Sequence, residues 1–301
     1  MAEKCSSIAP KPAKIYLPKF DRVPATVLDY LVERFPGIEK ETWLERMNSG
    51  KVVDEESIAV NPATPYRYGK TIYYFREVAD ELQIPFQETI LFQNDDLLVA
   101  DKPHFLPVTP TGPAVNECML SRLQRRTGIQ DLSPIHRLDR DTAGLVLFST
   151  VKKTRHLYHK LFVEQKVAKR YLSVAPIPTS SDVKAGTEWT VENRLGPGEP
   201  WFRMKVIDGP VNARTRIVLK EVCEDRGLFE LCPATGKKHQ LRVHMAAIGF
   251  PIVNDCFYPE LNQFALSDFS RPLQLLAKRI EFHDPVTDKD FVFQSIRELS
   301  A

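Results

Sequence analysis

The residues best suited to chemistry lie in a charged turn that runs directly into an apolar segment. Asp139 stands between Arg137 and Arg140, and residues 143–148 are apolar and mainly Leu and Val. That run predicts a buried strand, so we expect the Asp139 carboxyl group on a tight loop at the rim of a core. Nearby guanidinium groups would hold it ionised and aim it at a ligand. A solvated turn with local ion pairs is the alternative.

Basic residues gather around this turn, although the whole chain has a net charge of only +2. Residues 121–171 contain twelve Lys or Arg and four Asp or Glu, an excess of eight positive charges. This local excess favours a polyphosphate backbone as a binding partner. A solvated basic helix balanced by acids elsewhere would give the same count.

The composition is that of a soluble globular protein, with 43% hydrophobic and 27% charged residues among 301. We find no run of eighteen apolar residues and therefore expect no membrane span. The first residues lack the basic patch and apolar core of a secretory signal. The five cysteines are scattered and odd in number, which fits reduced thiols in a cytoplasmic protein.

We expect neither a metal nor a cofactor. A metal set could be drawn from Cys223, Cys232, His239 and His244. The eight residues between the two cysteines do not match the short spacing of a structural zinc knuckle. The chain also contains neither a P-loop nor a dinucleotide-binding fingerprint.

The pattern of elements predicts an α+β chain with a small N-terminal α/β module. Residues 1–20 are expected to be a flexible arm, 21–76 a module of two helices (24–35, 41–48) and two strands (51–53, 71–75), and 77–88 a linker. A catalytic domain is expected at 89–299, with helices at 114–127, 154–164 and 240–248 and strands at 97–100, 143–149, 170–175, 202–207, 214–222, 227–232, 273–276 and 291–293. This order favours a largely antiparallel sheet.

Four segments resemble, in the same order, the motifs of the RluA-type RNA pseudouridine synthases. They are residues 90–103, 136–148, 169–174 and 235–255, within about the last two-thirds of the chain. The resemblance implies the pseudouridine synthase fold, which is a curved, mostly antiparallel mixed sheet with flanking helices and a central active cleft. It also implies that Asp139 is the catalytic aspartate.

The resemblance implies functions for other residues. Arg242 is expected to pair with Asp139, and a surface arginine on an amphipathic helix is the alternative. Tyr171 is expected beneath the uracil, although an aromatic residue that fills a sheet face would look the same in sequence. Arg137 is expected to fill the space left by a flipped base, with a simple phosphate contact as the alternative. The predicted substrate-binding residues are His136, Arg137, Arg140, Thr235, Lys237, Lys238 and Gln240.

Two of these predictions rest on local pattern as well. His136 is expected to shape the loop through hydrogen bonds and not to act as an acid or base. Residues 235–238 are expected to open a helix whose amides, with Lys237 and Lys238, bind a phosphate. A simple N-cap turn is the competing interpretation.

The N-terminal module resembles the small alpha-L RNA-binding module. It departs from that pattern because only Arg46 and Lys51 are basic on the second helix and the loop after it, among several acids. The departure puts RNA binding by this piece in doubt.

The resulting hypothesis is an enzyme that flips specific uridines out of structured ribosomal or transfer RNA and isomerises them to pseudouridine. RNA is the expected partner, the protein is expected to be a monomer, and no membrane is involved. An RNA-binding protein without catalysis is one alternative. A metal-dependent nuclease or phosphatase is another, and would need clustered carboxylates such as Asp95–Asp96 or Asp139 with Asp141.

Overall fold

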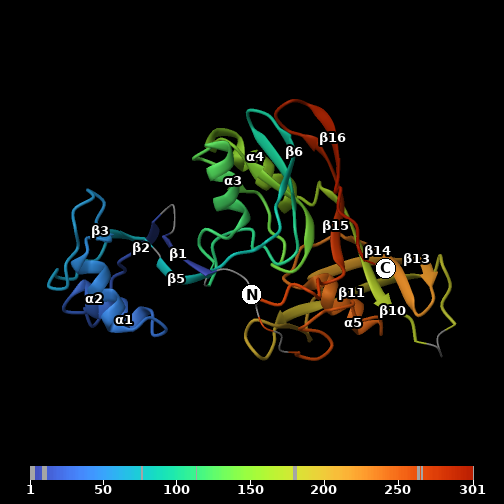
Figure 1. Cartoon of the computed structure of the whole chain (residues 1–301), viewed down its shortest axis with the longest axis horizontal. Coiled ribbons are helices and arrows are strands. Elements are labelled where there is room, and N and C mark those ends of the chain that lie inside the picture. Colours follow the sequence, from blue (N-terminus) through green and yellow to red (C-terminus); the bar gives the residue numbers. More distant parts are fainter. Residues whose placement is uncertain are drawn as a thin grey trace. The chain divides into compact units, whose positions relative to one another are not determined.

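The structure is a computed structural model that describes residues 4–8, 12–75, 77–112, 114–178, 182–262, 265 and 267–300 (Figure 1). The described chain forms two compact units. The small unit contains residues 4–81 and 112–116, and the large unit contains residues 82–111 and those from 117 onward. No helix in the described ranges is long and apolar enough to cross a membrane.

The small unit packs two helices on a three-stranded sheet. The helices are α1 (Val27–Arg34) and α2 (Lys40–Asn48), and the strands are β2 (Ala13–Tyr16), β3 (Val52–Val53) and β4 (Thr71–Tyr74) in the order β2-β4-β3. α1 begins with a capping box, because the Thr26 hydroxyl accepts from the Asp29 amide while the Asp29 carboxylate accepts from the Thr26 amide. Trp43 is fully buried in the core between helices and sheet.

The segments expected to be an arm and a linker contain strands, so these two predictions are wrong in part. Within 1–20 lie β1 (Lys4–Ile8) and β2, and residues 77–88 begin with β5 (Glu77–Leu82), which pairs with β1. Short strands show little periodicity, and the burial of Ile15 and Leu17 against the helices was not visible in the composition. Glu81 is also buried, where its carboxylate accepts the amides of Val115 and Asn116.

The large unit is built on a mixed, mostly antiparallel sheet, as the predicted fold class requires. Its strand order over the described residues is β12-β11-β13-β14-β10-β15-β9-β7-β6, with β16 beside β15 and β8 beside β9. The strands are β6 (Thr89–Gln93), β7 (Leu97–Lys102), β8 (Ser133–Pro134), β9 (Ala143–Ser149), β10 (Ala168–Pro176), β11 (Glu188–Pro197), β12 (Met204–Ile207), β13 (Ala213–Cys223), β14 (Arg226–Pro233), β15 (Leu275–Asp284) and β16 (Lys289–Gln294).

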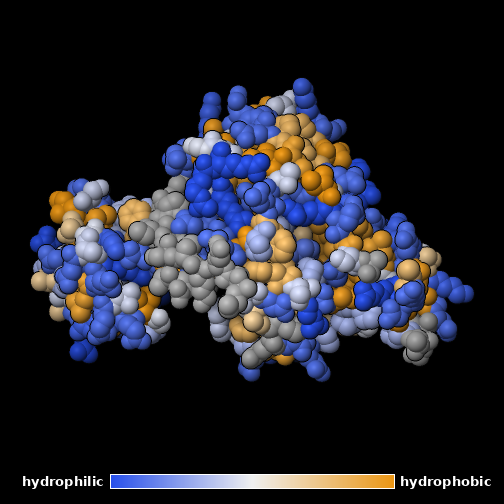
Figure 2. All heavy atoms as spheres, in the orientation of Figure 1, coloured by the Kyte–Doolittle hydropathy of each residue, from blue (hydrophilic) through white to orange (hydrophobic). Residues whose placement is uncertain are grey.

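Three helices flank this sheet. α3 (Met119–Thr127) and α4 (Lys152–Val163) gather at its β6–β9 end, and α5 (Gln240–Ala247) lies at the end formed by β11 to β13 (Figure 1). The helix predicted at 114–127 begins only at Met119, because the sulfur of Cys118 accepts the Ser121 amide and so caps it. In Figure 2, apolar side chains reach the surface over β6 and β16, whereas hydrophilic ones cover the region around α3.

β7 and β9 are buried on both faces, which explains the continuous apolar run of β9. Leu98 and Val146 pack into one core with α3, whereas Leu97 and Leu145 pack into another with α4. A strand covered on both sides has no polar face, so its sequence does not alternate. The loop that carries Asp139 therefore joins an element that is fixed from two sides.

The segment that follows β16 is hydrogen-bonded to β7. Ser295 donates to both carboxylate oxygens of Asp101, at 2.9 and 2.8 Å, and the Ile296 amide donates to the same carboxylate at 2.9 Å. Asp101 is the penultimate residue of β7 and is fully buried. Residues separated by 194 positions in sequence are therefore joined at the base of the Asp139 loop.

Gly144 is required where β9 runs parallel to β15. Its φ is +112°, and a Cβ atom there would lie 2.3 Å from the backbone oxygen of Ala277. We predict that Gly144→Ala destabilises the protein by more than about 3 kcal/mol, measured by urea unfolding. Gly186→Ala is the matched control, because it has a φ of +92° but open space around the new atom. It should cost only about 1–2 kcal/mol. Equal losses in the two variants would contradict the steric argument.

Candidate active site

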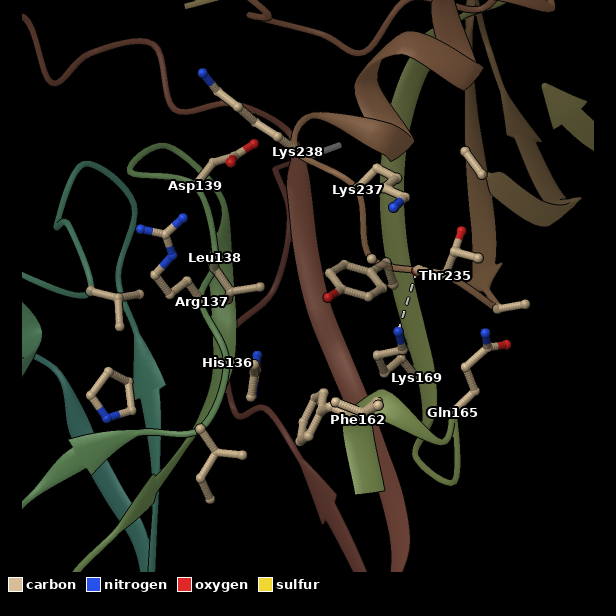
Figure 3. A pocket seen from close by; sticks show the side chains of 18 of the residues that line it. His136, Arg137, Leu138, Asp139, Phe162, Gln165, Lys169, Thr235, Lys237 and Lys238 are labelled. Carbon is tan, nitrogen blue, oxygen red and sulfur yellow. Dashed lines mark hydrogen bonds between the residues drawn. The ribbon is translucent and has the colours of Figure 1, made fainter. Parts of the chain in front are cut away.

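A cleft of about 1270 Å³ lies in the large unit between two walls (Figure 3). Arg137 and Asp139 stand on one wall, and Lys169, Thr235 and Lys237 stand on the facing wall. A smaller cavity of about 110 Å³ is lined by Asp139 together with Tyr171 and Arg242. The structure therefore brings together the three residues predicted to be catalytic.

The Asp139 loop is attached to β7 through a buried lysine. Lys102 is fully buried, and its ammonium donates to the carbonyl oxygens of Pro103 (3.0 Å), Leu106 (2.8 Å) and Arg140 (2.9 Å). Burial lowers the pKa of Lys102 to about 7, although the charges of Asp141 and Asp139 oppose this. The lysine thereby ties the carbonyl next to Asp139 to the strand beneath it.

Arg242 contacts Asp139, but its closer partner is Asp255. Its Nε and Nη2 donate to the two Asp255 oxygens at 2.8 and 2.6 Å, whereas Nη1 lies 3.5 Å from Oδ2 of Asp139. Burial alone would lower the pKa of Arg242, but the hydrogen bonds and charge of Asp255, together with Asp139, raise it. The guanidinium thus stays charged while it faces both carboxylates.

The two carboxylates beside Arg242 differ in their exposure to solvent. The side chain of Asp255 is 0% exposed and that of Arg242 2%, whereas that of Asp139 is 28% exposed and lines the cleft. The rings of Phe257 and Tyr258 lie 4.7 and 5.6 Å from the Arg242 guanidinium carbon. Asp255 therefore holds the arginine in place, and Asp139 is the carboxylate a ligand can reach. Asp255 lies at the end of the fourth motif, and no sequence pattern points to its pairing with Arg242.

His239 is a second neighbour of Asp139 that was not assigned to the site. Its Nε2 lies 4.0 Å from Oδ1 of Asp139, and its Nδ1 is 3.0 Å from the hydroxyl of Tyr258. Burial lowers the pKa of His239 to about 4, so the ring is neutral at pH 7 and the contact is not an ion pair. Arg242 is therefore the cation beside Asp139.

Tyr171 and Lys169 project from β10 into the cleft. A bulge between Arg170 and Tyr171 interrupts the pairing with β15, and such bulges re-aim a side chain. Burial raises the pKa of Tyr171 and the charge of Asp139 raises it further, so the phenol stays neutral. The Lys169 ammonium donates to the carbonyl of Thr235 at 3.4 Å, and burial lowers its pKa. Lys169 belongs to the third motif, residues 169–174, which predicts no function for it.

The predicted loop residues have different environments. His136 accepts the Leu147 amide at 3.2 Å and stacks on Phe162 with ring centroids 4.7 Å apart. Burial lowers the pKa of His136 to about 3, so it is neutral, as a loop-shaping acceptor must be. Arg140 pairs with Asp141 at 3.2 Å. The Arg137 side chain is exposed and makes no ion pair within the described part of the chain.

Residues 235–238 lie before α5 and are not helical, so the prediction that they open a helix is wrong. α5 begins at Gln240, after His239 in a left-handed conformation with a φ of +54°. The Gln240 side-chain oxygen accepts the Lys237 amide at 3.0 Å and the Thr235 hydroxyl at 2.8 Å. Gln240 is buried, so these contacts hold the turn. The Lys237 amide, which was expected to bind a phosphate, already donates its hydrogen bond to Gln240. Lys237 and Lys238 remain exposed at the cleft.

The histidines once considered as metal ligands have other partners. His244 contacts Thr215 and Asn193, at 2.9 and 3.1 Å, and His239 contacts Tyr258. In the ranges that the structure describes, no group of three or more His, Cys, Asp or Glu side chains could hold a metal ion.

Comparisons with known proteins converge on one family. A family model described as RNA pseudouridylate synthase matches residues 96–247. An uncharacterized RNA pseudouridine synthase of Synechocystis is 28% identical over 77% of this chain and 79% of its own length. The dual-specificity RNA pseudouridine synthase RluA of Vibrio vulnificus is 31% identical over 65% of this chain and 78% of its own. The solved human RNA pseudouridylate synthase domain containing 1 shares the fold, with a TM-score of 0.55 and 20% identity over 70% of this chain and 84% of that one.

We predict that Asp255→Asn destabilises the protein by about 3–5 kcal/mol, because it leaves the buried Arg242 charge without its main counterion. The midpoint of urea unfolding measures this. Asp288→Asn removes an exposed carboxylate that pairs with His283, and should change stability by no more than about 0.5 kcal/mol. Similar losses in both variants would show that Asp255 is not the residue that compensates Arg242.

Proposed function

The chain belongs to the RNA pseudouridylate synthase family, and we propose that it isomerises specific uridines in structured RNA with Asp139 as the catalytic carboxylate. The contact between Asp139 and the buried Arg242 guanidinium carries this proposal, because it joins an accessible carboxylate to a fixed positive charge. Tyr171 borders the same cavity. The enzyme is an isomerase that changes how uracil is attached to ribose.

The reaction breaks the bond between carbon one of the ribose and nitrogen one of the uracil. The uracil then turns, and its carbon five bonds to the same ribose carbon. The proton on carbon five leaves and nitrogen one gains a proton, so atoms and electrons balance without a redox step. Asp139 either attacks carbon one of the ribose or removes a proton from carbon two. Both tasks require an ionised carboxylate, which the Arg242 charge favours.

Tyr171 acts in this scheme as a neutral phenol. Its raised pKa keeps the hydroxyl protonated at neutral pH, so the side chain is not ionised to act as a base on its own. The Asp139 carboxylate, freed once the new carbon–carbon bond has formed, is the base for the proton on carbon five. The hydroxyl of Tyr171 then positions the uracil or relays that proton.

Arg137 is proposed to occupy the gap left when the target base flips out. Its exposed guanidinium is planar, so it can stack on neighbouring bases and bond their phosphates. Arg140, Lys237 and Lys238 line the same cleft and would hold the RNA backbone. Thr235, Gln240 and His136 support the RNA indirectly, because their described contacts shape the two walls.

Ribosomal RNA, transfer RNA or both are the proposed substrates, acted on by a cytoplasmic monomer. Two helices on a three-stranded sheet also support the proposal of an alpha-L-like module at 21–76, to which β2 (Ala13–Tyr16) adds a strand from before its expected start. Mapping pseudouridine in RNA from cells with and without the gene would identify the target positions. If every pseudouridine position is still modified in the deletion strain, the substrate assignment is wrong.

We predict that Asp139→Asn lowers turnover by more than about 10³-fold, because an amide can neither attack nor accept a proton as a carboxylate does. Tritium release from RNA labelled at carbon five of uridine measures turnover, and filter binding should show RNA affinity within about twofold of wild type. Asp131→Asn, which alters an exposed carboxylate paired with Lys152, is the control and should leave both values unchanged. A near-normal rate in Asp139→Asn would mean that another group attacks the ribose or removes its proton.

We predict that Arg137→Ala lowers turnover more on a uridine stacked in a stem than on one in a single-stranded loop. Unstacking costs a few kcal/mol only in the stem, so a residue that fills the vacated space helps there most. Matched hairpins with the target uridine moved between stem and loop would measure the difference. Equal losses on both hairpins would leave Arg137 as a phosphate contact alone.

A further inference from the structure

An exposed tryptophan lies at the tip of the hairpin formed by β11 and β12. Trp201 is 83% exposed, whereas Trp43 is fully buried and Trp189 packs against Phe229 and Phe250. These are all the tryptophans of the chain. Among the large hydrophobic side chains that the structure describes, Trp201 is the most exposed, and its aromatic faces are available to a partner.

The residues that follow Trp201 fix the hairpin tip. The ring of Phe202 packs on that of Phe257 with centroids 5.2 Å apart. Arg203 donates to the carbonyl of Pro259 at 2.9 Å, and its guanidinium lies 5.0 Å from the Tyr258 ring. The amide of Met204 donates to the Tyr258 hydroxyl at 2.7 Å. The tip is therefore attached to the segment whose rings also pack on Arg242, and Trp201 is presented from an anchored element.

Trp201 also reaches the rim of the active cleft. The ammonium of Lys238 lies 5.8 Å from the centre of the indole ring. Lys238 lines the cleft together with Asp139, and Figure 3 shows the two side chains at the same end of it. The indole thus lies beside an ammonium that lines the same cleft as the proposed catalytic carboxylate.

We propose that Trp201 and Lys238 form a second nucleotide subsite, in which a base flanking the target uridine stacks on the indole and its phosphate binds the ammonium. Every nucleobase has a π face that can stack on an aromatic side chain, and a lysine is a point charge suited to phosphate. A flipped uridine disrupts the stacking of its neighbours, and such a subsite would give one of them a new surface. This inference rests on the proposed function, because it assumes an RNA substrate.

A docked protein is a poorer match for this surface. Phe202 and Arg203 are already engaged with Phe257, Pro259 and Tyr258, so the large hydrophobic side chain that the tip leaves exposed is one indole, with a cation beside it. Protein interfaces are centred on larger contiguous apolar patches.

The test uses two single-stranded RNA heptamers, each with one central uridine. One carries adenosine at the other six positions, and the second has abasic residues there. Binding is measured by fluorescence anisotropy with the full chain. Trp201→Ala should bind the adenosine heptamer about tenfold more weakly and the abasic one as wild type does. Trp201→Phe should retain most of the affinity, since it keeps an aromatic face. Val206→Ala, at an exposed position on β12, is the matched control and should bind both as wild type does.

Two further measurements separate the two parts of the subsite. The adenosine heptamer should quench tryptophan emission in the wild type and not in Trp201→Phe. Lys238→Gln should reduce the slope of log affinity against log salt by about one, as expected for one lost phosphate contact. Unchanged affinity of Trp201→Ala for the adenosine heptamer, or emission unaffected by RNA, would overturn the inference.

These outcomes are distinct from a failure of the proposed isomerase. Stacking on Trp201 without tritium release from labelled RNA by the wild-type protein would refute the isomerase and retain the subsite. Normal tritium release with no effect of Trp201→Ala on binding would refute only the subsite.

Discussion

The site depends on one buried guanidinium that must be neutralised inside the protein. Arg242 is 2% exposed, and a charge so far from water is tolerated only with a close counterion. Asp255 supplies that counterion through two hydrogen bonds. The third nitrogen of the guanidinium, Nη1, then faces Asp139, whose carboxylate can stay partly exposed. Asp255, which is fully buried, thereby offsets the free-energy cost of desolvating the arginine, and the Asp139 carboxylate can remain accessible from the cleft.

The rest of the large unit holds Asp139 in place as firmly as Asp255 holds Arg242. Asp139 precedes a strand packed between two helices, and the carbonyl of the next residue is held by the buried Lys102. Reactive groups need positions defined to within a fraction of an ångström, and a loop alone rarely provides that. Each wall of the cleft is therefore anchored independently, one through β9 and β7 and the other through the turn held by Gln240.

Much of this could be predicted from the sequence, and what could not has physical causes. The unbroken apolar run predicted β9, and the mixed order of helices and strands predicted the fold class. The meeting of Asp139, Tyr171 and Arg242 was implied by the resemblance of the motifs to a known family. Asp255 was missed because a buried acid is identified by its partner, which is thirteen residues away. Lys102 is recognisable in the sequence as a lysine at the end of an apolar strand. Its three hydrogen-bond acceptors are backbone carbonyls, however, and no side-chain type in the sequence indicates which they are. The strands near the N-terminus are short, and only their pairing reveals them.

The residues that complete the site are synthesised long after the residues they contact. Asp139 and Arg242 are 103 positions apart, and the bond between Ser295 and Asp101 spans 194. A polypeptide emerging from the ribosome would expose β7 and the Asp139 loop long before the segments that complete them. Contacts so distant in sequence form slowly, after much chain entropy has been lost. The nascent chain should therefore be catalytically silent until the segments around Arg242 and Ser295 have been synthesised. Until then its unpaired strand edges are most open to chaperones or aggregation.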